Sequence, residues 1–110
     1  MIDLLPEHAE IVRNILRQHV PEAAVFAFGS RVSCTAKPHS DLDLVLVGKE
    51  AMPIQRMHLL EEAFADSDLP FRVDVLDWNA ISPTFQQIIR REYVVLHQGN
   101  LKIDSEDDVI

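Results

Sequence analysis

The chain has 110 residues, a net charge of −8 and 47% hydrophobic residues. This length suits one domain with its own core, and the composition argues against an intrinsically disordered chain. The acidic balance argues against a protein that binds nucleic acid over its whole surface, because phosphate binding needs clustered Lys and Arg. A local nucleotide pocket remains compatible with it.

The sequence limits where the protein can be located and whether it can form a disulfide. No apolar run reaches the ~20 residues that a membrane span needs, and no signal peptide precedes the first charged residues. The single cysteine, Cys34, allows neither an internal disulfide nor a thiolate zinc site. We therefore expect a cytoplasmic protein without membrane contact.

Helical and strand patterns alternate along the chain. In chain order the sequence predicts a helix at 7–18, a buried strand at 23–28, a polar turn and loop at 31–40, a strand at 41–47, a helix at 53–65, a strand at 71–76, a helix after Ser82-Pro83 and a short strand at 93–96. This order predicts a small α/β (α+β) domain with one sheet and helices packed on it. The strand order cannot be read from the sequence.

The pattern also predicts which helix residues face the core and where the domain ends. The inward residues are expected to be Ile54, Met57, Leu60 and Phe64 in one helix, and Phe85, Ile88 and Ile89 in the next. The domain is expected to cover residues 1–100, followed by an acidic, mobile tail at 101–110.

Two carboxylates share one side of the second predicted strand. Asp41 and Asp43 are two residues apart, so their Cα atoms lie about 7 Å apart and their side chains point the same way. Leu42, Leu44 and Leu46 then point to the other side and form core. Because like charges on an apolar strand repel, a bound Mg²⁺ or Mn²⁺ would stabilise this arrangement.

A third carboxylate, Asp74, lies in the middle of the next apolar strand, between Val73 and Val75. Three acids on two strands can hold two metal ions ~3.5–4 Å apart, the spacing used for in-line nucleotidyl transfer. The alternative is an ordinary strand carboxylate that pairs with Arg72.

A Gly-Ser pair follows the first strand directly. Gly29 allows a positive φ or a close approach of backbone to phosphate, and Ser30 offers a hydroxyl together with free N–H groups of the following turn. Arg31 would add positive charge to this phosphate seat. Taken alone, such a pair is usually only a turn.

These residues together resemble a known signature. Gly29-Ser30, ten residues, Asp41-Leu42-Asp43 and the later Asp74 look like the motif of the polymerase-β-type nucleotidyltransferase superfamily. The phrases 28–32 and 40–44, with the short chain, more closely resemble the minimal nucleotidyltransferases (MNT). The resemblance covers roughly residues 8–97. It differs at Cys34, where relatives often carry glycine, so this turn is expected to have another shape.

The resemblance implies a fold, a site and a reaction. The fold would be a small mixed sheet flanked by helices. Gly29 and Ser30 would hold the nucleotide β/γ-phosphates, and Asp41, Asp43 and Asp74 would be the catalytic metal ligands. Members of this family are commonly paired with a small helical HEPN toxin, which they neutralise by complex formation and by transferring AMP from ATP to a tyrosine.

Other functions stay open at this point. The same fold can serve as a catalytically weak or silent antitoxin that blocks its partner by occlusion. Nucleotidyl transfer to a small molecule such as an aminoglycoside is a third candidate, although members of that kind carry an additional substrate-binding domain. The chain offers no second domain for acceptor recognition, so specificity is expected to come from a partner protein.

Overall fold

The computed structural model describes residues 2–33, 35 and 40–100. Its elements in chain order are α1 (Pro6–His19), β1 (Ala24–Phe28), α2 (Ser30–Ser33), β2 (Leu42–Val47), α3 (Ile54–Ala65), β3 (Val73–Asp77), the 3-10 turn η1 (Trp78–Ala80), α4 (Pro83–Arg91) and β4 (Val94–His97). The alternation predicted from the sequence is confirmed, with boundaries that differ by one or two residues. Cys34 and the predicted tail lie outside the described residues.

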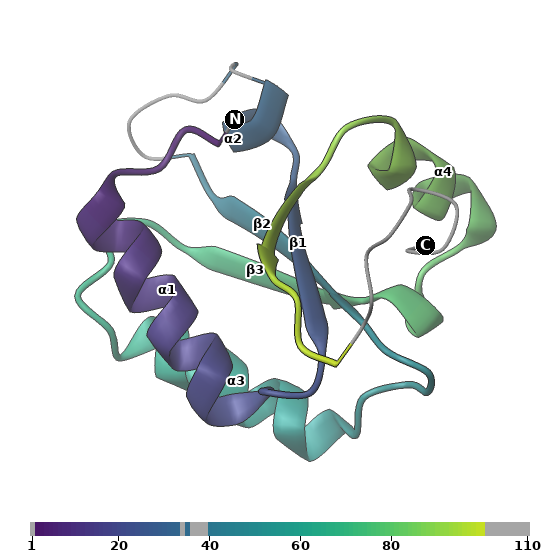
Figure 1. The fold of residues 1–110 in the computed structure, drawn as a ribbon, viewed down its shortest axis with the longest axis horizontal. Helices are drawn as coiled ribbons and strands as arrows, with labels where there is room; N and C mark the ends of the chain where they lie inside the picture. The colour runs from purple at the N-terminus through teal and green to yellow at the C-terminus, as the bar shows by residue number, and fades with distance from the viewer. Residues whose placement is uncertain (1, 34, 36–39, 101–110) are drawn as a thin grey trace.

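The four strands form one mixed sheet in the order β3-β2-β1-β4. β1 pairs antiparallel with both β2 and β4, whereas β2 and β3 are parallel. A parallel pair needs a long crossover, and here α3 provides it. Helices α1 and α3 lie on one side of the sheet and α4 on the other (Figure 1). The predicted fold class is confirmed.

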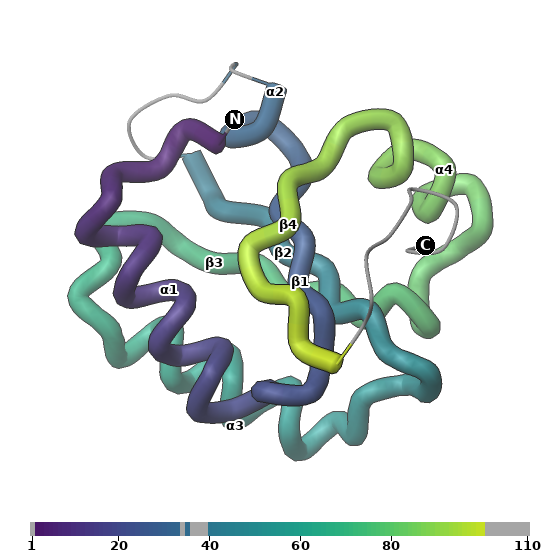
Figure 2. Tube along the Cα trace, in the orientation of Figure 1, coloured from purple at the N-terminus to yellow at the C-terminus, as the bar shows by residue number. Residues whose placement is uncertain are grey.

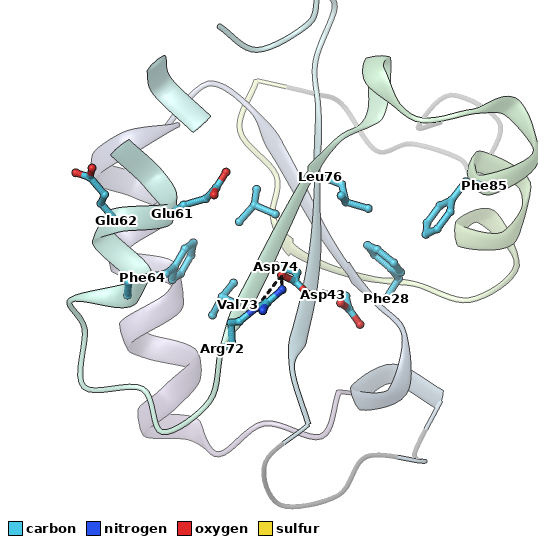
Figure 3. Close-up of a pocket in the computed structure, with 12 residues that line it drawn as sticks. Phe28, Asp43, Glu61, Glu62, Phe64, Arg72, Val73, Asp74, Leu76 and Phe85 are labelled. Carbon is cyan, nitrogen blue, oxygen red and sulfur yellow. Dashed lines mark hydrogen bonds and ion pairs between the residues drawn. The ribbon is translucent and has the colours of Figure 1, made fainter. Parts of the chain in front are cut away.

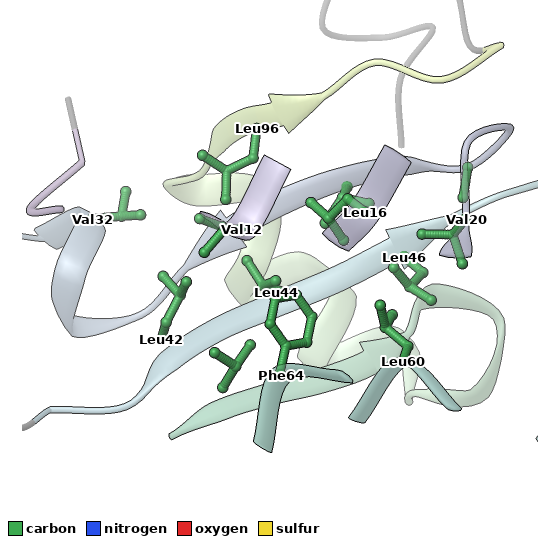
Figure 4. Packing of buried hydrophobic residues seen from close by; sticks show 14 residues of the cluster. Val12, Leu16, Val20, Val32, Leu42, Leu44, Leu46, Leu60, Phe64 and Leu96 are labelled. Atoms are coloured by element: carbon green, nitrogen blue, oxygen red, sulfur yellow. The ribbon is translucent and has the colours of Figure 1, made fainter. Parts of the chain in front are cut away.

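The face under α1 and α3 holds the larger core. Leu42, Leu44 and Leu46 of β2 are almost fully buried there, as their alternation predicts. Figure 4 shows them packed against Leu60 and Phe64 of α3 and against Val12 and Leu16 of α1, which cover the same face of the sheet. Burying a leucine or phenylalanine side chain contributes about 1.5–3 kcal/mol, so this face supplies much of the stability.

The face under α4 holds a smaller core. Phe26, Val45, Trp78 and Ile89 are buried in it, and the Phe26 ring stacks on Tyr93 at 5.0 Å between centroids. The predicted cap of α4 is confirmed, because the Ser82 hydroxyl accepts a hydrogen bond from the Phe85 amide. This core covers only part of its face, and the sheet surface around the N-terminal ends of β2 and β3 is left for the site.

Two residues predicted to face inward do not. Ile54 is 70% exposed and Ile88 is 54% exposed. Ile54 is the first residue of α3, beyond the reach of the sheet, and the narrow contact of α4 is filled by its neighbours Phe85 and Ile89. Helical spacing gives the direction of an apolar face but not how far the neighbouring surface extends.

Within the described part of the chain, no helix is long and apolar enough to cross a membrane.

Candidate active site

The three predicted acids come together at one end of the sheet. Asp43 of β2 is the register partner of Asp74 on β3. Neighbouring strands lie about 4.8 Å apart, so these side chains stand next to each other on the α4 side. Asp41 lies just before β2, two residues from Asp43, and is expected to point to the same side. The parallel pairing of two strands that are remote in sequence therefore builds the cluster.

Gly29 meets this cluster from β1. Phe28 pairs with Asp43, so the chain leaves β1 directly beside that carboxylate. Gly29 has φ +80°, and a Cβ atom there would lie 2.4 Å from Oδ2 of Asp43. The left-handed backbone favours glycine at this position, and a Cβ there would make the Asp43 carboxylate move. The turn and the acid are thus fitted to each other.

The turn after Gly29 is a single helical turn, α2. The amides of Val32 and Ser33 both donate to the Gly29 carbonyl at 3.0 Å. These two N–H groups are therefore satisfied within the turn. The binding of an anion by the amides that open the turn stays a prediction. Ser30 opens the turn and is partly exposed, next to the acids.

Arg31 is placed differently from the phosphate contact that we predicted. Its side chain is buried, with Nε and Nη2 donating to the Ser40 carbonyl and Nη1 to the Asp3 carbonyl. The guanidinium also lies 4.1 Å from the centre of the Phe71 ring. Figure 2 shows the N-terminal segment running beside α2. These contacts tie the N-terminal segment to the residue before Asp41, so Arg31 supports the site from behind.

Arg72 is the cation next to the acids. Its Nη2 and Nε donate to Oδ1 of Asp74 at 2.7 and 3.1 Å (Figure 3). Its Nε also lies 3.9 Å from Oδ2 of Asp41. The sequence had suggested this pairing only as the alternative to metal binding. The structure shows it directly, although 74% of the Arg72 side chain is exposed.

The pKa of Asp43 is raised above its usual range. Burial is the main cause, and the neighbouring charges of Asp74 and Asp41 add to it, while Arg72 opposes the shift. A half-buried carboxylate with two like charges beside it is a group that a cation would stabilise. The cluster therefore carries more negative charge than its own protein surroundings compensate.

A cavity of about 820 Å³ opens at the acids. Asp43 and Asp74 lie within it, Phe28, Leu76 and Phe85 line its α4 side, and Glu61, Glu62 and Phe64 line its α3 side (Figure 3). It is a groove that runs around the edge strand β3, from the α4 side of the sheet to the α3 side. The apolar side is suited to a flat ring, and the acid end to charged or metal-bound groups.

The donor set fits a hard divalent cation. Carboxylate oxygens are the ligands that Mg²⁺ and Mn²⁺ prefer, and the crowding at Asp43 is the electrostatic reason to bind one. In the part of the chain that the structure describes, no three Asp, Glu, His or Cys side chains already converge on one point. The Asp74 carboxylate is instead turned toward Arg72 (Figure 3).

Sequence reasoning missed the apolar wall of this cavity. Phe28 and Phe85 meet edge to face, with centroids 5.8 Å apart, although they belong to β1 and α4. Phe85 was predicted only as a core residue. No local signal marks it as cavity lining, because its position follows from how α4 packs on the sheet.

Comparison with known proteins places this chain in a family. The family model described as "Polymerase beta, Nucleotidyltransferase" matches residues 10–101. The chain belongs to this nucleotidyltransferase family. The resemblance and the enzyme class predicted from the Gly-Ser and Asp-x-Asp motifs are thereby confirmed. The matched range spans the six predicted site residues, and their roles stay predictions.

One curated relative and several solved structures are similar. The chain is 47% identical over 104 residues to "Probable protein adenylyltransferase MntA" of Haemophilus influenzae, covering 94% of this chain and 91% of that protein. A crystal structure of a toxin–antitoxin with AMP-PNP has a TM-score of 0.73 at 21% identity, covering 90% of this chain and 77% of that one. The complex of tri-AMPylated Shewanella oneidensis HEPN toxin with MNT antitoxin has a TM-score of 0.58 at 20% identity, covering 80% and 71%. At these identities the two structures show a shared fold.

Proposed function

We propose that this chain is a metal-dependent protein adenylyltransferase. It transfers AMP from ATP to a tyrosine hydroxyl of a HEPN toxin and so acts as the antitoxin of the pair. The relative that is 47% identical is named a protein adenylyltransferase, which supports the reaction type. The similar structures contain an ATP analogue in one case and an AMPylated HEPN toxin in another, which supports ATP and this class of partner.

The reaction forms one bond and breaks one. The acceptor oxygen attacks the α-phosphorus of ATP, the bond from this phosphorus to the α–β bridging oxygen breaks, and pyrophosphate leaves. The acceptor hydroxyl loses its proton. Divalent cations supply Lewis-acid activation and charge neutralisation in reactions of this kind.

In this proposal, different residues of the chain would bind the metal ions, seat the phosphates and line the cavity. Asp41, Asp43 and Asp74 hold the cations, which we propose to be Mg²⁺ or Mn²⁺. Gly29 lets the backbone pass directly beside Asp43, so that the β/γ-phosphates seated at Gly29 and Ser30 lie next to the metal ligands. The apolar wall at Phe28 and Phe85 excludes water from one side of the cavity.

One observation carries this proposal. Asp43 and Asp74 are register partners on neighbouring strands, and Gly29 at the end of β1 lies directly against the Asp43 carboxylate. An ordinary turn beside a strand does not need this fit.

The charge of −8 would also favour a basic partner, such as an RNA-cleaving protein, and a cytoplasmic location is expected for such a pair.

The test is intact mass spectrometry. The chain is co-expressed with the protein encoded next to it, purified as a complex and incubated with ATP and Mg²⁺. The proposal predicts that the partner gains the mass of one or more AMP groups, and that Asp43→Asn abolishes this gain while the complex still forms.

A stable complex without any added mass would contradict the enzymatic proposal. It would favour the alternative, in which the chain neutralises its partner by binding alone. The Asp43→Asn variant separates the two, because occlusion does not depend on that carboxylate.

A further inference from the structure

Arg72 pairs with two of the proposed metal ligands. Both of its short hydrogen bonds end on the same atom, Oδ1 of Asp74, and its Nε also faces Asp41. These N–H groups use the lone pairs of Oδ1 and leave Oδ2 unengaged by Arg72, so only a cation that ligates through Oδ1 must displace them. The guanidinium also repels a divalent cation at either oxygen, and through this repulsion the two compete for the carboxylate.

The Arg72 side chain is held by charge and not by packing. It is 74% exposed, and it forms two hydrogen bonds and an ion pair with Asp74 and lies 3.9 Å from Asp41. Fixing a long, exposed side chain costs conformational entropy, which the attraction of the acids must outweigh. Such a side chain is easily displaced once that attraction is satisfied in another way.

Arg72 also lines the cavity, directly before β3 begins. A guanidinium released from Asp74 would still lie in the space proposed for ATP, where its fork of N–H groups suits phosphate oxygens. After its release from Asp74, the Arg72 guanidinium can therefore contact the phosphate groups of ATP.

We propose that Arg72 is a displaceable counter-ion of the metal ligands. It balances Asp74 and Asp41 until a divalent cation takes its place, and so it lowers the affinity of the site for that cation. Arg72 is a positioning residue in this scheme, because it acts through Asp74. The inference rests on the proposed function insofar as Asp74 and Asp41 bind a cation.

The test is a titration with Mn²⁺ in the absence of nucleotide. Binding is measured from the electron paramagnetic resonance signal of the Mn²⁺ that remains free. Arg72→Gln is expected to bind Mn²⁺ about two- to five-fold more tightly than the unchanged chain, the range that an exposed ion pair can account for. Arg72→Lys, which keeps the charge but loses the fork, is expected to lie between the two. Arg17→Gln on α1 removes the same charge from the opposite side of the sheet and serves as the control.

A second measurement is thermal unfolding. In EDTA, Arg72→Gln is expected to melt at a lower temperature than the unchanged chain, and Mn²⁺ is expected to raise its melting temperature more. Equal or weaker Mn²⁺ binding by Arg72→Gln would overturn the proposal, because Arg72 would then be neutral or would hold Asp74 in a ligating position. Loss of Mn²⁺ binding in Asp43→Asn tests the metal site separately, so the two failures can be distinguished.

Discussion

The two sides of strand β2 show how one short segment serves two purposes. Toward α1 and α3 it presents Leu42, Leu44 and Leu46, all nearly fully buried. Toward α4, Asp43 is only partly buried and lies at the cavity. Alternation along a strand keeps these sets apart, so the folding side can be dry while the other side keeps charges that cost stability. The comparison predicts that stability and chemistry can be broken independently.

The largest effect is expected from Asp43→Asn. If this carboxylate is a metal ligand, its loss removes several kcal/mol of transition-state stabilisation, a fall of about 10³-fold or more in AMP transfer. The free energy of unfolding should stay equal or rise slightly, because a half-buried charge beside two like charges is removed. Transfer assays and urea unfolding on the same preparation measure both. If Asp43→Asn lowered the free energy of unfolding as well as AMP transfer, the two sides of β2 would not have separate roles.

Leu44→Ala should break the other side of the same strand. Leu44 is fully buried, and removing such a side chain costs about 2–5 kcal/mol of unfolding free energy. Val95→Ala on the edge strand β4, where the side chain is 37% exposed, is the control and should cost much less. If Leu44→Ala left the unfolding midpoint in urea unchanged, the assignment of this face as the main core would be wrong.

Gly29→Ala tests the junction between the two sides. The substituted residue must keep φ near +80° and place its Cβ against Asp43, so we expect a loss of about 1–2 kcal/mol from the backbone alone. AMP transfer should fall further because Asp43 has to move. Gly48→Ala is the matched control, since its Cβ would lie 3.8 Å from the nearest atom. Similar behaviour of the two variants, in unfolding and in transfer, would remove the argument for a close fit.

The smallest effect concerns an ion pair outside the site. Arg56 holds Glu22 through two hydrogen bonds and lowers the pKa of Glu22 from 4.5 to about 2. The pair therefore contributes stability at pH values above 4.5, and this contribution is lost as the pH falls from 4.5 toward 2. Because both side chains are substantially exposed, we expect less than about 1 kcal/mol.

The check on this ion pair compares the unchanged chain with Glu22→Gln in urea at pH 7 and at pH 3. The difference between them should shrink at pH 3, and AMP transfer at pH 7 should be unaffected. A difference that grew on acidification would mean that the sign of the pKa shift is wrong.

Much of the site could be predicted from the sequence because its parts are local. The Asp41–Asp43 spacing and the leucines between and after them define both sides of β2 without any tertiary information. Gly29 follows a strand directly, and the need for glycine there is a local backbone property. The motif, taken as a set, was specific enough to predict the family.

What could not be predicted depends on tertiary contacts. The pairing of Asp43 with Asp74 requires the parallel register of β2 and β3, which the sequence does not encode in a readable way. Arg31 stands beside Ser30 in sequence, yet its guanidinium is drawn inward by carbonyls at Asp3 and Ser40. Ile88 has helical spacing for a core position, but among residues 2–33, 35 and 40–100 no element covers it, and it is 54% exposed.

The most direct test of the central claim uses two isotopically labelled forms of ATP. The chain and the HEPN partner proposed for it are incubated in parallel with α-³²P-ATP and γ-³²P-ATP, each with Mg²⁺, and the protein-bound label is measured. The account predicts label on the partner only from the α-labelled form, because the bond between the α-phosphorus and the pyrophosphate is the one that breaks. Label from the γ-phosphate, or no label from either form, would contradict adenylyl transfer.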